Sequence, residues 1–278
     1  MTVKTIDLYE EYHLPRAGAG GFLTLYIREK GNGVAARPAM LVLPGGGYHM
    51  CSDREAEPIA VEYLAAGFQA FVLNYSCAPA VYPAAFNEAC LAVHYIRTHA
   101  EELSVQKDKV AAIGFSAGGH LAGMIGIRFA ECPAAKELAI SAEDCRPDAV
   151  ILSYPVVTGN PAFSHADSLT ALFGEGKEDT AFFSNEDKVT AAAAPAFLWH
   201  TANDELVNVK NSLALAAGYQ QAGVPFELHV FESGPHGMSL SDKETCCGWA
   251  PYNNAHVADW KKLSTDWLRS RGFEQKNA

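Results

Sequence analysis

Residues 109–124 read KVAAIGFSAGGHLAGM. The apolar run 109–114 predicts a buried strand, and the apolar spacing in 117–130 predicts a helix that follows it at once. Ser116 lies at the junction, with Gly114 two residues before it and Gly118 two residues after it. A serine on so sharp a turn brings these neighbours almost into contact, and glycine at both places removes the side chains that would collide. The pattern in this context favours a nucleophilic serine over one that only caps a helix.

Strand and helix patterns alternate on both sides of this junction. The alternation indicates an α/β fold with a mostly parallel central sheet and helices on both faces. Residues 6–12 and 23–28 are expected to pair antiparallel at the sheet edge, and the absence of a linker predicts a single domain over residues 1–278. The other expected strands are 40–43, 68–74, 109–114, 149–154, 197–201 and 226–231, and the expected helices are 54–66, 84–99, 117–130, 211–222 and 256–271.

One segment, residues 156–195, interrupts the alternation with a mixed composition. A structureless loop of that length is uncommon inside a compact domain, so we expect short helices in it. The segment follows the sixth expected strand and is therefore predicted to form a small lid over the top of the sheet.

The composition limits both the kind of fold and the classes of molecule that the chain is expected to bind. Hydrophobic residues make up 49% of the sequence and charged residues 19%, which suits one large core and excludes a wholly disordered chain. The formal net charge of −11 disfavours nucleic acids and anionic membranes as partners. No apolar run approaches the roughly 18 residues of a membrane-spanning helix. The first 15 residues also lack the apolar run of a signal peptide, so we expect a cytoplasmic protein.

Seven cysteines occur, with no Cys-x-x-Cys pair among them. This spacing argues against a zinc site or a thioredoxin-type site and predicts free thiols. No metal site is expected, and the sequence leaves open whether the chain forms a homodimer.

A glycine-rich loop follows the first expected parallel strand, in the order Leu43-Pro-Gly-Gly-Gly-Tyr48. Three glycines allow backbone N–H groups to turn inward and approach a substrate closely. We expect Gly46 and Gly47 to form an oxyanion hole together with the N–H of Ala117, the residue after the candidate nucleophile. The alternative is a flexible turn without a catalytic part. Tyr48 would then lie at the mouth of the site, where it either contacts the leaving group or packs.

Candidate partners for the serine follow two later strands, in the chain order serine, acid, histidine. Asp204 comes after the expected strand 197–201, with Glu205 as the alternative acid. His236 comes after the expected strand 226–231 and is placed to act as the general base. His120, one turn into the helix after the serine, is a candidate to line the substrate site or to support it.

Together, these motifs resemble the acetyl-esterase/lipase-like carboxylesterases of the α/β-hydrolase superfamily, a group that includes xylan and acetyl esterases. The chain is also similar to the hormone-sensitive-lipase-like esterases, but Pro44 stands where that group has histidine and Phe115 where it has an acidic residue. The motifs that carry the resemblance are PGGGY (44–48), REAEP (54–58), GFSAGGHL (114–121), FLWHT (197–201) with Asp204, and GPHG (234–237).

The resemblance implies a serine carboxylesterase that hydrolyses short-chain, acetyl-type esters, including those of acetylated carbohydrates. It implies an acyl-enzyme intermediate on Ser116, a small-molecule ester substrate and no cofactor. Three alternatives stay open: a serine peptidase or arylformamidase on the same triad, a longer-chain lipase, and a binding protein on an inactive hydrolase fold. The intact set of serine, acid and histidine disfavours the last.

Overall fold

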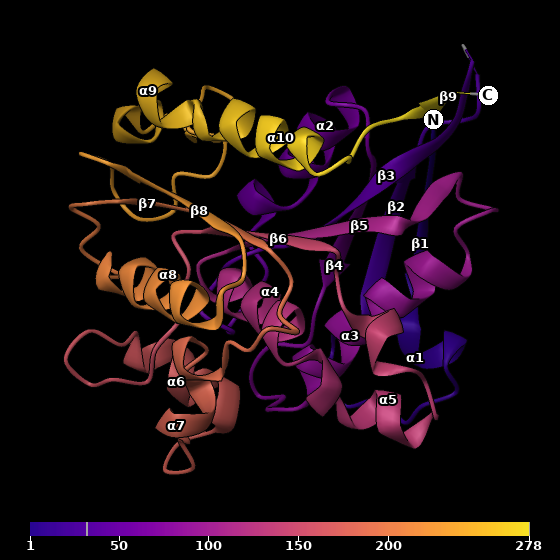
Figure 1. Ribbon diagram of the computed structural model, residues 1–278. Coiled ribbons are helices and arrows are strands. Elements are labelled where there is room, and N and C mark those ends of the chain that lie inside the picture. Colours follow the sequence, from indigo (N-terminus) through magenta and orange to yellow (C-terminus); the bar gives the residue numbers. More distant parts are fainter. Residues whose placement is uncertain (32, 278) are drawn as a thin grey trace.

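A nine-stranded sheet forms the centre of the computed structural model, which describes residues 1–31 and 33–277. The strands are β1 (Thr2–Asp7), β2 (Phe22–Ile27), β3 (Val34–Leu43), β4 (Gln69–Asn74), β5 (Val105–Phe115), β6 (Ala149–Ser153), β7 (Ala196–Thr201), β8 (Phe226–Phe231) and β9 (Lys276–Asn277). Their order is β1-β2-β4-β3-β5-β6-β7-β8, with β9 against β3 (Figure 1). Strands β3 to β8 are parallel, and β1 and β2 are antiparallel at one edge, which confirms the α/β class.

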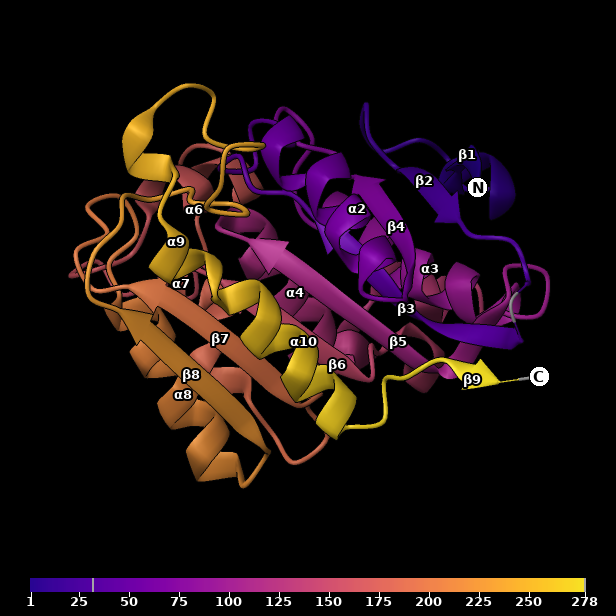
Figure 2. The same cartoon turned by 90° about the horizontal axis from the view of Figure 1, so that it is seen from above.

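Helices cover both faces of this sheet (Figures 1 and 2). On one face, α2 (Glu57–Ala65) and α10 (Trp260–Ser270) pack over Met40, Val42 and other apolar side chains of the parallel strands. On the other face lie α3 (Ala84–Thr98), α4 (Ala117–Ile127) and α8 (Lys210–Ala222), which cover Leu41 and Leu43. Because both faces are buried, the central strands are apolar throughout rather than alternating.

Several expected boundaries differ from the structure. The first strand ends at Asp7, because the Asp7 carboxylate accepts the N–H groups of Tyr9 and Glu10 and starts α1 (Leu8–Glu11). The helix expected from residue 54 is a 3₁₀ turn, Asp53–Glu55, followed by α2, because the backbone leaves the helical region at Ala56. The closing helix is likewise divided into α9 (Ala255–Ala258) and α10.

The candidate lid, residues 156–195, contains α6 (Ala166–Phe173), α7 (Thr180–Phe183) and a short 3₁₀ turn, in agreement with the short helices expected there. Its aromatic side chains pack inward. The ring of Phe182 lies 4.6 Å from that of Tyr82, and Phe183 is fully buried against His120 at 4.0 Å. Packing of this kind fixes the short helices onto the body of the protein. The remaining short helix is α5 (Pro133–Glu137).

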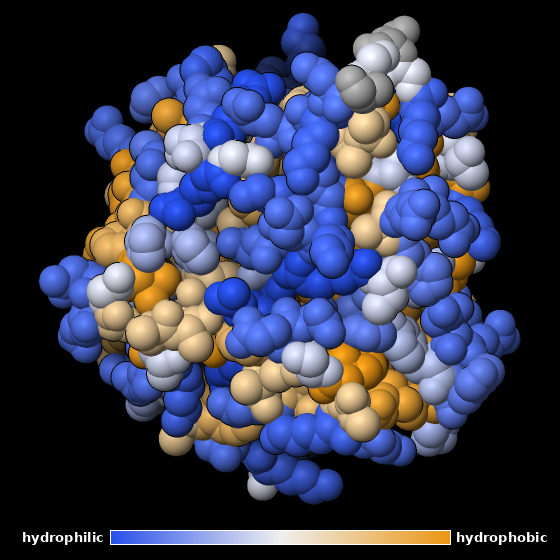
Figure 3. Space-filling view, turned by 45° about the vertical axis from the view of Figure 1, so that its right-hand side comes forward, coloured by the Kyte–Doolittle hydropathy of each residue, from blue (hydrophilic) through white to orange (hydrophobic). Residues whose placement is uncertain are grey.

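The surface is dominated by hydrophilic residues on the face shown in Figure 3, where hydrophobic residues form small patches between them. Within residues 1–31 and 33–277, no helix combines the length and the apolar character needed to cross a membrane.

Candidate active site

Ser116 lies on a sharp turn between β5 and α4, with φ 52° and ψ −117°. Its N–H donates to the carbonyl oxygen of Ser153 on the neighbouring strand at 3.0 Å. The flanking glycines are sterically required, since a Cβ on Gly114 would lie 2.0 Å from the carbonyl oxygen of Gly118, and a Cβ on Gly118 would lie 2.1 Å from that of Leu43. The turn is strained for a residue with a side chain, and the glycines leave the space that it needs.

The structure brings Ser116, His236 and Asp204 together from the ends of three strands. Nε2 of His236 lies 2.8 Å from Oγ of Ser116, and Nδ1 of His236 lies 2.7 Å from Oδ2 of Asp204. The other carboxylate oxygen of Asp204 accepts the N–H groups of Leu206 and Val207 at 3.0 and 2.9 Å. The alternative acid, Glu205, is exposed and makes none of these contacts. This arrangement can transfer a proton from the serine hydroxyl to the imidazole.

The Asp204 carboxylate is held in its ionised form. Burial alone would raise its pKa, but the hydrogen bonds from His200 and His236, with further help from the N–H of Val207, hold the pKa well below the usual range. An ionised Asp204 accepts the proton on Nδ1 of His236 and so leaves Nε2 free to face Ser116. His200 was not singled out from the sequence, because nothing local distinguishes it from a buried core histidine.

The loop after β3 places Gly46 and Gly47, the expected oxyanion donors, in the cavity that Ser116 also lines. Gly46 and Gly47 have φ values of 130° and 66°, which a residue with a side chain rarely adopts, and both line the same cavity as Ser116. Ala117 is the first residue of α4, where a helix leaves its N–H unpaired. The loop is anchored from below by the hydroxyl of Tyr75, which donates to the carbonyl oxygen of Pro44 at 2.6 Å.

Of the roles that the sequence left open for Tyr48 and His120, the structure favours packing and support over contact with substrate. Both side chains are only 1% exposed, and neither lines the cavity. The Tyr48 hydroxyl lies 2.8 Å from Nδ1 of His120, while Nε2 of His120 lies 2.9 Å from the carbonyl oxygen of Phe183. Burial lowers the pKa of His120 to about 4, so it is neutral near pH 7. This pair therefore links the glycine-rich loop, α4 and the lid.

A cavity of about 380 Å³ opens above Ser116 and His236. Its lining includes the polar side chains of His49, His165 and Asp167, which the sequence did not single out as site residues. Nε2 of His49 lies 3.1 Å from Oδ2 of Asp167, so this pair joins the glycine-rich loop to the lid helix α6 across the mouth. Their only signal in the sequence is their position beside the triple glycine and inside the lid segment.

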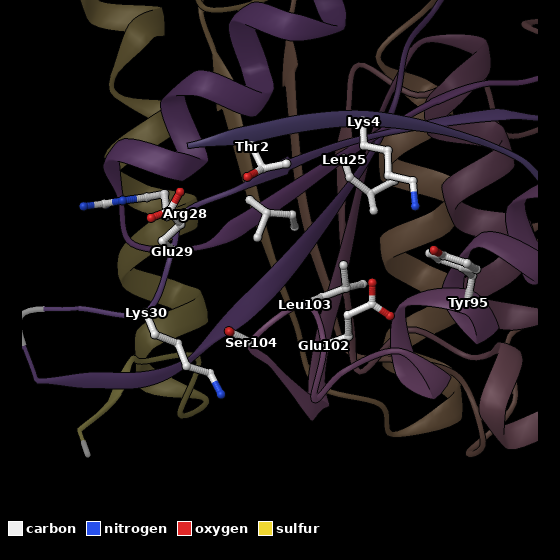
Figure 4. A pocket seen from close by; sticks show the side chains of 11 residues that line it. Thr2, Lys4, Leu25, Arg28, Glu29, Lys30, Tyr95, Glu102, Leu103 and Ser104 are labelled. Atoms are coloured by element: carbon white, nitrogen blue, oxygen red, sulfur yellow. The ribbon is translucent and has the colours of Figure 1, made fainter.

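A second cavity of about 360 Å³ lies at the opposite end of the sheet (Figure 4). Its lining includes Thr2 and Lys4 of β1, Tyr95 of α3 and Ser104. Because Ser104 precedes β5 and Ser116 follows it, the whole length of that strand separates this cavity from the candidate nucleophile. None of the expected site residues lines it.

The chain is similar to a known family and to several known proteins. The family model BD-FAE matches residues 23–218. The chain is 33% identical over 252 residues to the endo-1,4-beta-xylanase B of Butyrivibrio fibrisolvens, covering 88% of this chain and 39% of that protein. It is 26% identical over 239 residues to the acetylxylan esterase of Xylanibacter ruminicola, covering 84% of this chain and 45% of that protein. The chain thus spans less than half the length of these two relatives.

Among solved structures, the acetyl ester-xyloside bifunctional hydrolase from Caldicellulosiruptor lactoaceticus is similar to the whole chain. It is 32% identical with a TM-score of 0.83, and the match covers 98% of this chain and 97% of that one.

Proposed function

The chain belongs to the BD-FAE family of the α/β-hydrolase fold, and on that basis we propose that it is a serine carboxylesterase acting on short-chain, acetyl-type esters. Acetylated carbohydrates are the proposed natural substrates. The observation that carries the proposal is the 2.8 Å approach of Nε2 of His236 to Oγ of Ser116, with Asp204 behind the imidazole.

In the proposed first half-reaction, Oγ of Ser116 attacks the ester carbonyl carbon while Nε2 of His236 takes the hydroxyl proton. Asp204 fixes the imidazole orientation and stabilises the imidazolium that forms. The N–H groups of Gly46, Gly47 and Ala117 stabilise the oxyanion of the tetrahedral intermediate. His236 then returns the proton to the leaving alkoxide, so that the alcohol departs and the acyl group stays on Ser116.

In the second half-reaction, water replaces the alcohol. His236 removes a proton from the water as it attacks the acyl carbonyl carbon, and the same backbone donors stabilise the second tetrahedral intermediate. Collapse of that intermediate breaks the bond to Oγ of Ser116, which regains its proton from His236. A carboxylic acid and the free enzyme result, and the chemistry uses no cofactor.

Two observations support a small acyl group on a polar alcohol. The lid aromatics Phe182 and Phe183 pack inward and do not line the cavity over Ser116. The rim of that cavity carries His49, His165 and Asp167, which can exchange hydrogen bonds with sugar hydroxyls. Two of the similar proteins are also described by acetyl-ester substrates, an acetylxylan esterase and an acetyl ester-xyloside hydrolase.

The test is acetate release from p-nitrophenyl acetate and from acetylated xylo-oligosaccharides by the wild type and by Ser116→Ala. Ser264→Ala is the matched control, because Ser264 is also buried but lies on α10. We expect Ser116→Ala to lose several orders of magnitude in kcat and the control to keep wild-type activity. An anilide and N-formylkynurenine in the same panel test the peptidase and arylformamidase alternatives. Faster hydrolysis of either amide than of all esters would replace the esterase proposal.

A further inference from the structure

One buried carboxylate at the floor of the active-site cavity has no part in the mechanism above. Glu55 lies in the segment 54–58, is 4% exposed and lines the cavity beside Ser116. Its hydrogen-bond partners within residues 1–31 and 33–277 are neutral donors and include no cation. A buried, unpaired carboxylate costs free energy, so its presence beside the reacting groups calls for a function.

The two oxygens of Glu55 connect separate loops of the site. Oε2 accepts the N–H of Gly45, in the glycine-rich loop, at 2.8 Å. Oε1 accepts the hydroxyl proton of Tyr154, in the loop after β6, and the Tyr154 oxygen in turn accepts the N–H of Ser239 at 2.9 Å. Ser239 lies three residues after His236, whose ring centre is 5.0 Å from that of Tyr154. One carboxylate therefore joins the glycine-rich loop, the loop that carries Tyr154 and the loop that carries His236.

We infer that Glu55 and Tyr154 act as a positioning pair, which holds the oxyanion donors and His236 at their relative positions around Ser116. This inference rests on the proposed esterase function. The space around Gly45 is tight, because a Cβ there would lie 2.5 Å from Oε2 of Glu55 and 3.1 Å from Cβ of Ser116. A shift of the carboxylate therefore moves Gly45, and with it the N–H groups of the next two glycines.

A carboxylate can do this and an amide of the same size cannot. Glu55 accepts two hydrogen bonds from two loops and donates none. In Glu55→Gln, the amide nitrogen must face either the N–H of Gly45 or the hydroxyl of Tyr154. The first arrangement opposes two donors, and the second leaves the Tyr154 proton without its acceptor.

Electrostatics alone predicts the opposite effect. A negative charge near the oxyanion hole disfavours the developing oxyanion, so a purely electrostatic role for Glu55 predicts that its neutralisation speeds the reaction. The positioning role predicts that the same change slows it.

Buried groups elsewhere in the fold supply matched controls. Glu88 is 1% exposed and also accepts a tyrosine hydroxyl, from Tyr9, and a backbone N–H, from Ser76, but it lies on α3. Tyr63 is 1% exposed, like Tyr154, and its hydroxyl pairs with Ser264 between α2 and α10. The control variants Glu88→Gln and Tyr63→Phe lose similar bonds away from the site.

The experiment measures kcat and KM on p-nitrophenyl acetate, the inhibition constant of a trifluoromethyl ketone, and the melting temperature for these variants. For Glu55→Gln and Tyr154→Phe we expect kcat to fall by about 10- to 100-fold, less than the loss of a whole oxyanion donor, while KM changes little. Affinity for the ketone, which mimics the tetrahedral intermediate, should weaken in parallel with kcat/KM. The controls should keep wild-type kcat even if their melting temperatures fall equally.

A double variant tests whether the two residues act as one unit. Glu55→Gln/Tyr154→Phe should cost about as much in kcat as the worse single variant. Wild-type or faster kcat in Glu55→Gln, or an equal loss in Glu88→Gln, would overturn the inference while leaving the esterase proposal intact. If Glu55→Gln does not fold, Tyr154→Phe decides by the same criteria. Failure of the wild type to cleave any ester would instead refute the proposed function itself.

Discussion

Asp204 lies between two histidines that contact the same carboxylate oxygen. Oδ2 is 2.7 Å from Nδ1 of His236 and 3.3 Å from Nε2 of His200. Both contacts favour the ionised form, so Asp204 supplies a fixed negative charge behind the imidazole. In the proposed mechanism, Asp204 imposes the tautomer and the orientation of His236.

Replacing Asp204 with asparagine removes that charge and allows the wrong imidazole tautomer. We expect kcat on p-nitrophenyl acetate to fall by about 10⁴-fold, the size of the equivalent loss in serine proteases. The adjacent Glu205→Gln is the control, since this exposed side chain makes no contact with His236, and it should stay within about twofold of wild type. Equal losses in the two variants would argue against Asp204 as the orienting acid.

His120 makes stability depend on pH. Burial lowers its pKa from 6.5 to about 4, so between these values the unfolded chain binds a proton and the folded protein does not. The unfolding free energy should therefore rise with pH in this window, with His120 contributing about 1.4 kcal/mol per unit. Urea unfolding at pH 5 and pH 6 measures the slope. His120→Gln should reduce it by that amount, and an unchanged slope would contradict the assignment.

The seven cysteine side chains are unpaired in the described structure. Cys51 and Cys77 lie near each other, since both thiols donate to the carbonyl oxygen of Tyr75, at 3.7 and 3.6 Å. Thiol titration of freshly purified protein, denatured without reductant, should find seven free thiols. Five or fewer would show that a disulfide forms in the isolated protein, and the Cys51–Cys77 pair would be the first to examine.

At the scale of helices and strands, the sequence predicted the features that a local pattern of residues determines. The turn at Ser116 was found because a strand, two glycines and a helix adjoin it, and Asp204 and His236 because each follows an apolar strand in the required order. The division of the 54–66 helix at Ala56 was missed, although Pro58, a residue that suits only the first turn of a helix, marks it. The first half of β3 was also missed, because Arg37 and Pro38 conceal the strand.

Contacts between distant loops were beyond local pattern altogether. Glu55 meets Tyr154 across 99 positions of the chain, and His49 meets Asp167 across 118. Tyr48 and His120 were placed in the site because they adjoin its motifs. The structure turns both inward, where each finds a buried hydrogen-bond partner instead of substrate.

The lid sets the expected acyl preference. Its aromatic residues Phe173 and Phe182 pack against each other and against Tyr82, and neither lines the cavity over Ser116. Each added CH₂ gains about 0.8 kcal/mol only where a pocket receives it. On p-nitrophenyl esters, kcat/KM should peak between acetate and butyrate and fall by octanoate. A profile that rises through decanoate would show that residues 156–195 open into an acyl channel, and a lipase would replace the short-chain esterase.

Across the whole molecule, the groups of the proposed mechanism come from four places in the chain and meet at one end of the parallel strands. The side chains of the proposed triad follow β5, β7 and β8, in the order Ser116, Asp204 and His236. The glycine-rich loop follows β3. This end is the carboxyl end of the strands, where the functional sites of open α/β folds lie. The family match confirms the resemblance to acetyl-esterase/lipase-like carboxylesterases that the motifs indicated.

The central claim is that Ser116 is a nucleophile activated by its neighbours, and covalent labelling tests it without reference to any natural substrate. The protein is incubated with a fluorophosphonate, and its intact mass and proteolytic peptides are measured. We predict one adduct per chain, on Ser116, absent from Ser116→Ala and formed at least 100-fold more slowly, as an order of magnitude, in His236→Ala. Labelling of a different residue, or full esterase activity in Ser116→Ala without any adduct, would contradict the account.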